Sequence, residues 1–318
     1  MKLRGDGKRG ALRKALYLLA GAAFIFQLAA AGCQKQKEER PAGKAFGQQE
    51  LLIGLIPEQN IFRQRERYLV LRKYLLDRLG ITVNFTSLSR YGNIIERFTA
   101  EKMDGAFFGS FTYALAHRQL GVEPLVRPVN LDGTSTYHGY IFVRKDSGIR
   151  SAGDMKGKRF AFVEHATMAG YLFPLAYFKA SNIPDPQRHL GQSFFSGSHD
   201  AAILAVLNRE ADIGAAKNTI FDQLASENPR IEQELIILAT SGVVPQNCLA
   251  VRKDLDPDLK AELKRVLLAM EKDPEGADVL RKFGARGFVE TTDRDYAYLY
   301  TLTAQAGIDL NTYQYKNK

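Results

Sequence analysis

The segment DGAFFGSFTYALAHR, residues 104–118, passes from a short apolar run into a longer amphipathic one. GAFFG, residues 105–109, is typical of a buried strand, and residues 111–118 are typical of a helix. Glycine and hydroxyl residues occupy the turn between them, at positions 109–112. A strand that passes through such a turn into a helix is the repeating unit of an α/β protein.

The same unit recurs along the rest of the chain. Apolar runs that predict strands, each next to a helical segment, are LLIGLI (51–56), ITVNFTSL (81–88), RFAFV (159–163), QSFFS (192–196), ADIGAA (211–216) and LIILAT (235–240). Strands that alternate with helices predict parallel sheets, and two successive blocks predict two lobes. The tetrapeptide VRKD occurs at 143–146 and 251–254. We therefore expect crossings between the lobes near 143–146 and 245–254, and C-terminal helices that pack on the first lobe.

Composition and charge limit the classes of function. At about 150 residues per domain, 318 residues predict two domains. The formal charge of +9 falls to +4 without residues 1–32, which hold six basic residues and one acidic residue. A mildly basic body favours a small anionic ligand over a nucleic acid, which needs clustered Lys and Arg. Five scattered histidines and two cysteines show no metal-site spacing, so we expect no metal, no cofactor and a buried Cys248.

The N-terminus has the pattern of an export signal. Basic residues precede an uncharged apolar run at 15–31, and Gly32-Cys33 follows. The stretch from Ala30 to Cys33 resembles the lipobox of bacterial lipoproteins, in which the cysteine is lipidated, although Ala30 replaces the usual Leu. We expect a signal peptide at 1–32 and a lipidated N-terminus with a polar linker at 33–49. The alternative is an uncleaved membrane anchor.

Three strand–helix turns carry glycine and hydroxyl residues, at 109–113, 166–171 and 196–200. In open α/β sheets, ligands bind where strands end and helices begin, and free N–H groups at a helix start favour an anion. Each turn alone is also explained as a helix cap. Together, one in the first lobe and two in the second, they predict a shared anion site.

With these segments in view, the chain resembles the phosphate/phosphite/phosphonate-binding proteins of ABC importers. The segments that carry the resemblance include IGLIPEQN (53–60), SRYGNIIERF (89–98), DGAFFGSFTYALAHR (104–118), VRKDSGIRSAGDMKGKRFAFV (143–163) and FSGSHDAAILAVLNREADIGA (195–215). The resemblance implies the two-lobed periplasmic binding protein fold (type II), with a hinge and an interlobe cleft. Lobe 1 would hold 50–144 and 250–318, and lobe 2 would hold 145–249.

The resemblance also implies ligand-binding residues. The family's tyrosine, hydroxyl and histidine positions fall on Tyr91, Ser110, Thr112, Thr167, Met168, Ala169 and His199. Met168 and Ala169 replace two hydroxyl residues, which removes side-chain donors and makes the site more apolar; His165 could supply a missing donor. Lys217 stands where family members often carry Asp or Asn. It would either pair with an extra negative charge or project into solvent.

The implied function is the substrate-binding component of an ABC importer. It would bind a phosphonate-like oxyanion on the periplasmic side of a bacterial membrane, act as a monomer tethered through Cys33, and deliver its ligand to an ABC permease. The altered pair Met168 and Ala169 leaves an alternative, a binding protein of this fold that senses another small ligand and signals to a membrane partner. An enzyme is the third reading, and no nucleophile–base pair or metal set in the sequence favours it.

Overall fold

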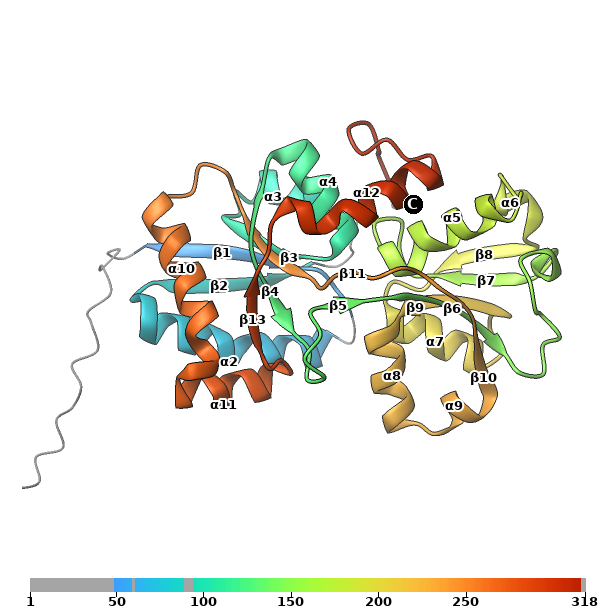
Figure 1. Ribbon diagram of the computed structural model, residues 1–318, viewed down its shortest axis with the longest axis horizontal. Helices are drawn as coiled ribbons and strands as arrows, with labels where there is room; N and C mark the ends of the chain where they lie inside the picture. Colours follow the sequence, from blue (N-terminus) through green and yellow to red (C-terminus); the bar gives the residue numbers. More distant parts are fainter. Residues whose placement is uncertain (1–48, 59–60, 89–93, 316–318) are drawn as a thin grey trace, which may run out of the picture. The chain divides into compact units, whose positions relative to one another are not determined.

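The computed structural model describes residues 49–58, 61–88 and 94–315. The described residues belong to one compact unit that begins at Gly43. They form two mixed sheets, each flanked by helices (Figure 1). We call the part around the first sheet lobe 1 and the part around the second sheet lobe 2.

The first sheet has six strands. In order across the sheet, they are β13 (Gly287–Glu290), β4 (Glu123–Val129), β12 (Cys248–Val251), β3 (Gly105–Phe108), β1 (Glu50–Leu55) and β2 (Thr82–Ser87). β1 pairs in parallel with β2 and β3, whereas β12 is antiparallel to both β3 and β4. The predicted strands are confirmed, but the purely parallel sheet is wrong. β12 enters this sheet directly from lobe 2, without the crossover helix that parallel neighbours require.

The second sheet has five strands. In order, they are β10 (Leu235–Thr240), β6 (Gly139–Arg144), β9 (Ile213–Lys217), β7 (Arg159–Phe162) and β8 (Gln192–Phe195). β7 pairs in parallel with β8 and β9, and β6 runs antiparallel to β9 and β10. Because β6 belongs to this sheet, the chain changes sheets before residue 139, earlier than the predicted crossing at 143–146. A short ladder of β5 (Thr136–Tyr137) and β11 (Val244–Pro245) joins the two crossing segments.

The helices cover the sheets as the apolar spacing predicts. They are α2 (Ile61–Leu79), α3 (Ile94–Ala100), α4 (Ser110–Leu120), α5 (Phe173–Ala180), α6 (Pro186–His189), α7 (His199–Leu207), α8 (Asn218–Glu227), α9 (Arg230–Glu234), α10 (Pro257–Ala269), α11 (Pro274–Phe283) and α12 (Ala297–Ala306). Short 3-10 helices are η2 (Gly153–Met155), η4 (Met270–Lys272) and η5 (Asp293–Tyr296), and a π-helix, η3, spans Met168–Leu172. None of these helices within the described ranges combines the length and apolar character needed to cross a bilayer.

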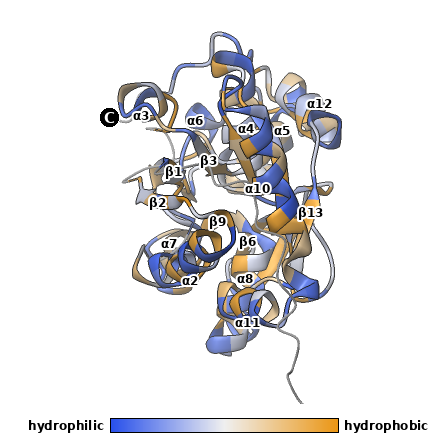
Figure 2. Cartoon of the chain, turned by 90° about the vertical axis from the view of Figure 1, so that its left-hand side faces the viewer, coloured by the Kyte–Doolittle hydropathy of each residue, from blue (hydrophilic) through white to orange (hydrophobic). Residues whose placement is uncertain are grey.

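In the long helix α2, the regularly spaced apolar residues of the sequence form the buried face. Leu71 and Leu75 are buried against α10 and α11, in one core cluster with Leu263 and Leu267. The helix ends at Leu79, and Gly80 follows it with a positive φ of 68°, a conformation that favours glycine. Figure 2 shows mixed colour on α2 and α11, as expected for helices with one buried face, and hydrophobic colour on β6 and β13.

The C-terminal helices divide between the lobes. α10 and α11 contact α2 and the first sheet, as the sequence predicts. α12 instead packs against α5, which belongs to lobe 2, and also contacts α4 of lobe 1. The expectation that all C-terminal helices pack on the first lobe is therefore wrong for α12, because its buried side chains Leu299 and Leu302 belong to the core cluster that includes α5.

Candidate functional site

The first glycine/hydroxyl turn opens α4 at the end of β3. Gly109 is the N-cap residue, and no side chain caps the helix. The Oγ atom of Ser110 lies 2.5 Å from the hydroxyl of Tyr137 in the interlobe ladder. Thr112 turns its hydroxyl back and donates to the carbonyl of Gly109 at 3.0 Å. Of the Ser110 and Thr112 hydroxyls, only that of Ser110 therefore reaches beyond its own helix.

The second turn follows β7 and begins with the π-helix η3. Thr167 donates its hydroxyl to the carbonyl of Glu164 at 2.7 Å, and Met168 and Ala169 are buried. The π geometry shows in the bond from Leu172 N–H to the carbonyl of Thr167, five residues earlier. A Cβ on Gly170 would lie 2.4 Å from the side chain of Val163, so glycine permits the close approach of this turn to the strand.

The third turn begins α7 at His199. The His199 side chain is 3 % exposed, and its Nδ1 accepts a hydrogen bond from the backbone N–H of Lys217 at 3.2 Å. Because Nδ1 accepts, the neutral ring carries its proton on Nε2. Burial lowers the pKa of His199 to about 4, so the imidazole is neutral at physiological pH. The backbone N–H of His199 donates to the carbonyl of Glu58 in lobe 1 at 3.4 Å.

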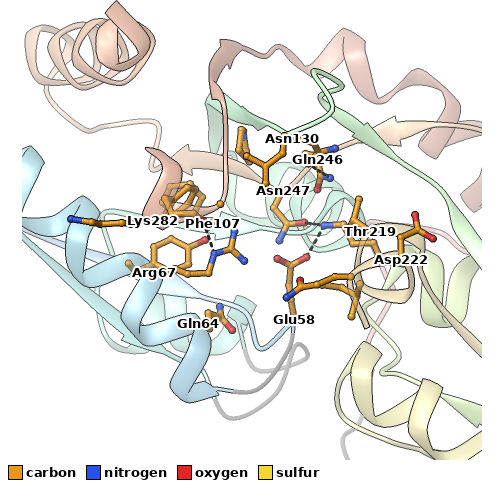
Figure 3. A pocket seen from close by; sticks show the side chains of 18 of the residues that line it. Glu58, Gln64, Arg67, Phe107, Asn130, Thr219, Asp222, Gln246, Asn247 and Lys282 are labelled. Atoms are coloured by element: carbon orange, nitrogen blue, oxygen red, sulfur yellow. Dashed lines mark hydrogen bonds and ion pairs between the residues drawn. The ribbon is translucent and has the colours of Figure 1, made fainter. Parts of the chain in front are cut away.

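Lys217, at the end of β9, lies at the centre of these contacts. Its Nζ atom is 2.7 Å from Glu58 Oε1 and 3.3 Å from Asn247 Oδ1, and it lies 4.5 Å above the ring of Tyr137. In Figure 3, dashed lines reach the labelled side chains of Glu58 and Asn247, which are the two partners of this ammonium. The ion pair joins lobe 2 to lobe 1. The open possibility that Lys217 projects into solvent is thus answered, because the residue is 4 % exposed.

Burial and charge act in opposite directions on Glu58. Burial works to raise the pKa of its carboxyl group, but the charge and hydrogen bond of Lys217 outweigh burial and hold the pKa below its ordinary value. His199 and Arg67 contribute in the same direction. The site therefore holds a fixed, paired carboxylate beside a neutral imidazole.

We call the side chains around this ion pair the interlobe polar cluster; its members are Glu58, Ser110, Tyr137, His199, Lys217 and Asn247. Contacts link the first turn to the third: Ser110 to Tyr137, Tyr137 to Lys217, and Lys217 to His199. η3, which begins the second turn, contacts α4. The glycine/hydroxyl turns of both lobes therefore face one shared region.

A cavity of about 910 Å³ lies beside the interlobe polar cluster. Its walls come from α2, from the start of α8 and from the segments next to the interlobe ladder. Of the predicted ligand residues, Lys217 alone is part of this lining among the described residues.

Of the remaining predicted residues, the structure describes His165 alone, which packs among aromatic side chains. His165 stacks on Phe195, with ring centroids 3.9 Å apart, and also contacts the ring of Tyr171. Burial lowers the pKa of His165. Tyr91 and Cys33 fall outside the described residues.

The chain matches a sequence profile described as "ABC transporter, phosphonate, periplasmic substrate-binding protein" over residues 53–296. The chain belongs to this family. It is therefore a periplasmic substrate-binding protein of the phosphonate family of ABC transporters, which is a family of binding proteins and not of enzymes.

Individual members of the phosphonate-binding family are similar over most of their length. The phosphate-import protein PhnD of Mycolicibacterium smegmatis is 26% identical over 89% of this chain and 94% of its own. The phosphonates-binding periplasmic protein of Escherichia coli is 25% identical over 87% of this chain and 81% of its own. A crystal structure of PhnD1 from Prochlorococcus marinus with methylphosphonate has a TM-score of 0.72 at 21% identity, covering 81% of this chain and 98% of that one.

Several residues at the interlobe polar cluster and the cavity are not among those identified from the sequence. Glu58 and Asn247 contact Lys217, and Arg67 and Gln64 line the cavity. Glu58 could have been found by the rule used for the turns, because it follows the end of β1 at the same sheet edge as Gly109. Arg67 and Gln64 lie within a helix whose periodicity indicates only its core face, so the sequence offered no signal for them.

Proposed function

We propose that the protein binds a phosphonate, phosphite or phosphate ion in the interlobe cleft at the polar cluster. The observation that carries the proposal is the buried Lys217 ammonium. It lies between the lobes, at the starts of the two helices α7 and α8. A cation together with such helix starts is suited to an oxyanion through charge-assisted hydrogen bonds.

Each predicted residue has a role in this proposal. Ser110 would exchange its bond with Tyr137 for a ligand oxygen, and neutral His199 would donate from Nε2. Tyr91, which lies outside the described residues, would contact the ligand, and Thr112 would hold the start of α4. Thr167, Met168 and Ala169 would contribute through the backbone, with His165 as a further donor. Lys217 would shift from Glu58 toward the ligand's charge.

The ligand would also close the lobes. A ligand stabilises the closed state only through better contacts there than in the open state. Lys217 and His199 belong to lobe 2, whereas Ser110 belongs to lobe 1, so an oxyanion that contacts all three gains its full set of bonds only when the lobes are together.

Calorimetry of the full chain in detergent tests the proposal with phosphate, phosphite, methylphosphonate and 2-aminoethylphosphonate. These compounds include the kinds of ligand that the names of the relatives state. We expect heat with at least one of them and none with sulfate. The absence of heat with all four would reject the phosphorus oxyanion.

We also propose that Cys33 is lipidated and anchors the chain to the membrane. The apolar run at 15–31 followed by Gly32-Cys33 supports this assignment. Metabolic labelling with a radioactive fatty acid should mark the protein, and Cys33→Ser should abolish the label. A labelled Cys33→Ser variant would refute the anchor. Light scattering of the Cys33→Ser variant should give a monomer.

A further inference from the structure

The cavity beside the interlobe polar cluster is much larger than a phosphonate group. Its volume of about 910 Å³ lies at the upper end of the roughly 300–1,000 Å³ range typical of pockets for organic ligands. Lys217 belongs to both the cluster and the cavity lining, so the two spaces meet at this residue. A ligand held at the cluster can therefore extend an organic group into the cavity.

Arg67 offers this cavity a positioned guanidinium. Its Nε donates to the carbonyl of Phe283 at 2.6 Å, and its Cζ lies 5.3 Å from the centroid of the Phe283 ring. These contacts fix the plane of the group and leave its terminal nitrogens without a partner among the described residues. Figure 3 shows the guanidinium pointing toward Glu58 and Asn247. A planar guanidinium held in this way is suited to bidentate bonding with a carboxylate.

The other charged side chains of the lining are already engaged or turned away. Lys217 pairs with Glu58, and Lys282 pairs with Asp278. Asp132 accepts two hydrogen bonds from Thr134, and Glu66 is exposed. Figure 3 shows the carboxylate of Asp222 directed away from Arg67. Within the described part of the lining, Arg67 is thus the cation that makes no ion pair, although its charge also acts on the carboxylate of Glu58.

Gln64 provides an independent sign that the cavity receives a polar ligand. Its side chain is 5 % exposed and lines the cavity one turn before Arg67 on α2. Nε2 donates to the carbonyl of Ile56 at 2.6 Å, but Oε1 is buried and has no hydrogen-bond partner in the part of the chain that the structure describes. A buried acceptor without a partner costs free energy, which a ligand donor would recover.

We propose that the ligand of this protein is a phosphonocarboxylate, with its phosphonate at the interlobe polar cluster and its carboxylate on Arg67. This inference rests on the proposed function and specifies its substrate class.

Matched ligand pairs test the inference on the full chain by calorimetry at pH 7.5. Phosphonoacetate, 3-phosphonopropionate and 4-phosphonobutyrate are compared with ethyl-, propyl- and butylphosphonate, in which a methyl group replaces the carboxylate. We expect at least one carboxylate to bind roughly tenfold or more tightly than its alkyl partner. In Arg67→Gln that preference should vanish, while the alkylphosphonate affinity stays the same.

Two variants separate a specific contact from a general charge effect. Lys282→Gln removes a positive charge from the same cavity and should keep the preference, because Lys282 already has a carboxylate partner. Arg67→Lys keeps the charge but loses the planar guanidinium, so it should keep only part of the preference for the carboxylate. Thermal melts establish whether each variant is folded. If Arg67→Gln does not fold, the matched ligand pairs on the wild type still show whether the protein prefers a phosphonocarboxylate.

The outcomes distinguish this inference from the proposed function. If alkylphosphonates bind but no carboxylate improves affinity, the inference is overturned and the proposed function stands. Equal weakening of both ligands by Arg67→Gln, or loss of the preference in Lys282→Gln, also overturns it. If no phosphonate binds at all, the proposed function fails, and the phosphonocarboxylate assignment fails with it.

Discussion

The Nζ atom of Lys217 lies 2.7 Å from Oε1 of Glu58, and this ion pair joins the end of β9 in lobe 2 to the segment after β1 in lobe 1. The lysine side chain is 5 % exposed and the glutamate side chain 21 %. Removal of one partner leaves the other charge buried and unpaired. We expect Lys217→Met or Glu58→Gln to lower the free energy of unfolding by about 3 kcal/mol, measured by urea denaturation.

The double variant and an exposed pair serve as controls. Lys217→Met combined with Glu58→Gln should cost less than the sum of the single changes, since no unpaired charge remains. Lys73→Met removes the exposed partner of Asp77 and should leave the urea midpoint unchanged. If both single variants of the interlobe pair are as stable as the wild type, the pair has no structural role.

His199 predicts a pH dependence of stability. The unfolded chain binds a proton on this imidazole below its ordinary pKa of 6.5, whereas burial lowers the pKa in the folded protein to about 4. Lowering the pH through this interval therefore favours the unfolded chain, by roughly 3 kcal/mol in total. Above pH 6.5 the residue contributes no slope.

His199→Asn isolates this contribution. The asparagine Oδ1 can take the place of Nδ1 as acceptor for the Lys217 N–H but does not titrate. Urea denaturation between pH 7.5 and 4 should show a smaller loss of stability in the variant than in the wild type. Parallel curves for the two proteins would mean that the histidine is not buried in its neutral form.

Because Ser110 and Tyr137 share a hydrogen bond, we expect their substitutions to have coupled effects on the free energy of unfolding. The Tyr137 hydroxyl is buried and has Ser110 as its partner, so Ser110→Ala leaves it unsatisfied at a cost of about 1–3 kcal/mol. Tyr137→Phe in the same background removes the orphaned hydroxyl and should restore most of that loss. The free energies of unfolding of the wild type, the two single variants and the double variant measure the coupling.

The same serine tests the proposed oxyanion contact. Ser110→Ala should weaken methylphosphonate binding roughly tenfold in calorimetry, the value expected for one hydrogen bond to a charged group. Ser181→Ala, at the exposed end of α5, makes the same chemical change away from the cleft and should not alter affinity. Equal affinity in both variants would remove Ser110 from the binding site.

Much of the fold could be predicted because the spacing of apolar residues, and the glycine and proline residues at the ends of elements, are local features of the sequence. Strand-length apolar runs, glycines such as Gly80 and prolines such as Pro257 mark the elements where the structure has them. The antiparallel position of β6 could not be read in this way. Its apolar run is compatible with either sheet, and its pairing with β9 and β10 depends on contacts far away in the sequence.

The candidate site was only partly visible in the sequence, for the same reason. Ser110 and His199 stand at strand–helix turns, where a positional rule selects them. Glu58 belongs to the site because it pairs with Lys217, which lies more than 150 residues later in the sequence. Arg67 belongs to it because the carbonyl of Phe283, also distant in the sequence, orients its guanidinium. The π-helix at Met168 depends on the close packing of Gly170 against Val163, which no single-residue preference encodes.

The absence of a side chain at Gly139 lets β6 pack closely against the helical segment of the second turn. A Cβ at this position in β6 would lie 2.9 Å from the ring of Phe173 and 3.1 Å from the Cα of Ala169, so the start of the helix would have to move. Gly139→Ala should therefore cost about 1–3 kcal/mol in the free energy of unfolding and also weaken methylphosphonate binding. Gly153→Ala is the matched control, since its nearest neighbour would be 3.6 Å away, and it should leave both quantities unchanged. A stable Gly139→Ala variant with wild-type affinity would show that β6 does not position the π-helix for ligand binding.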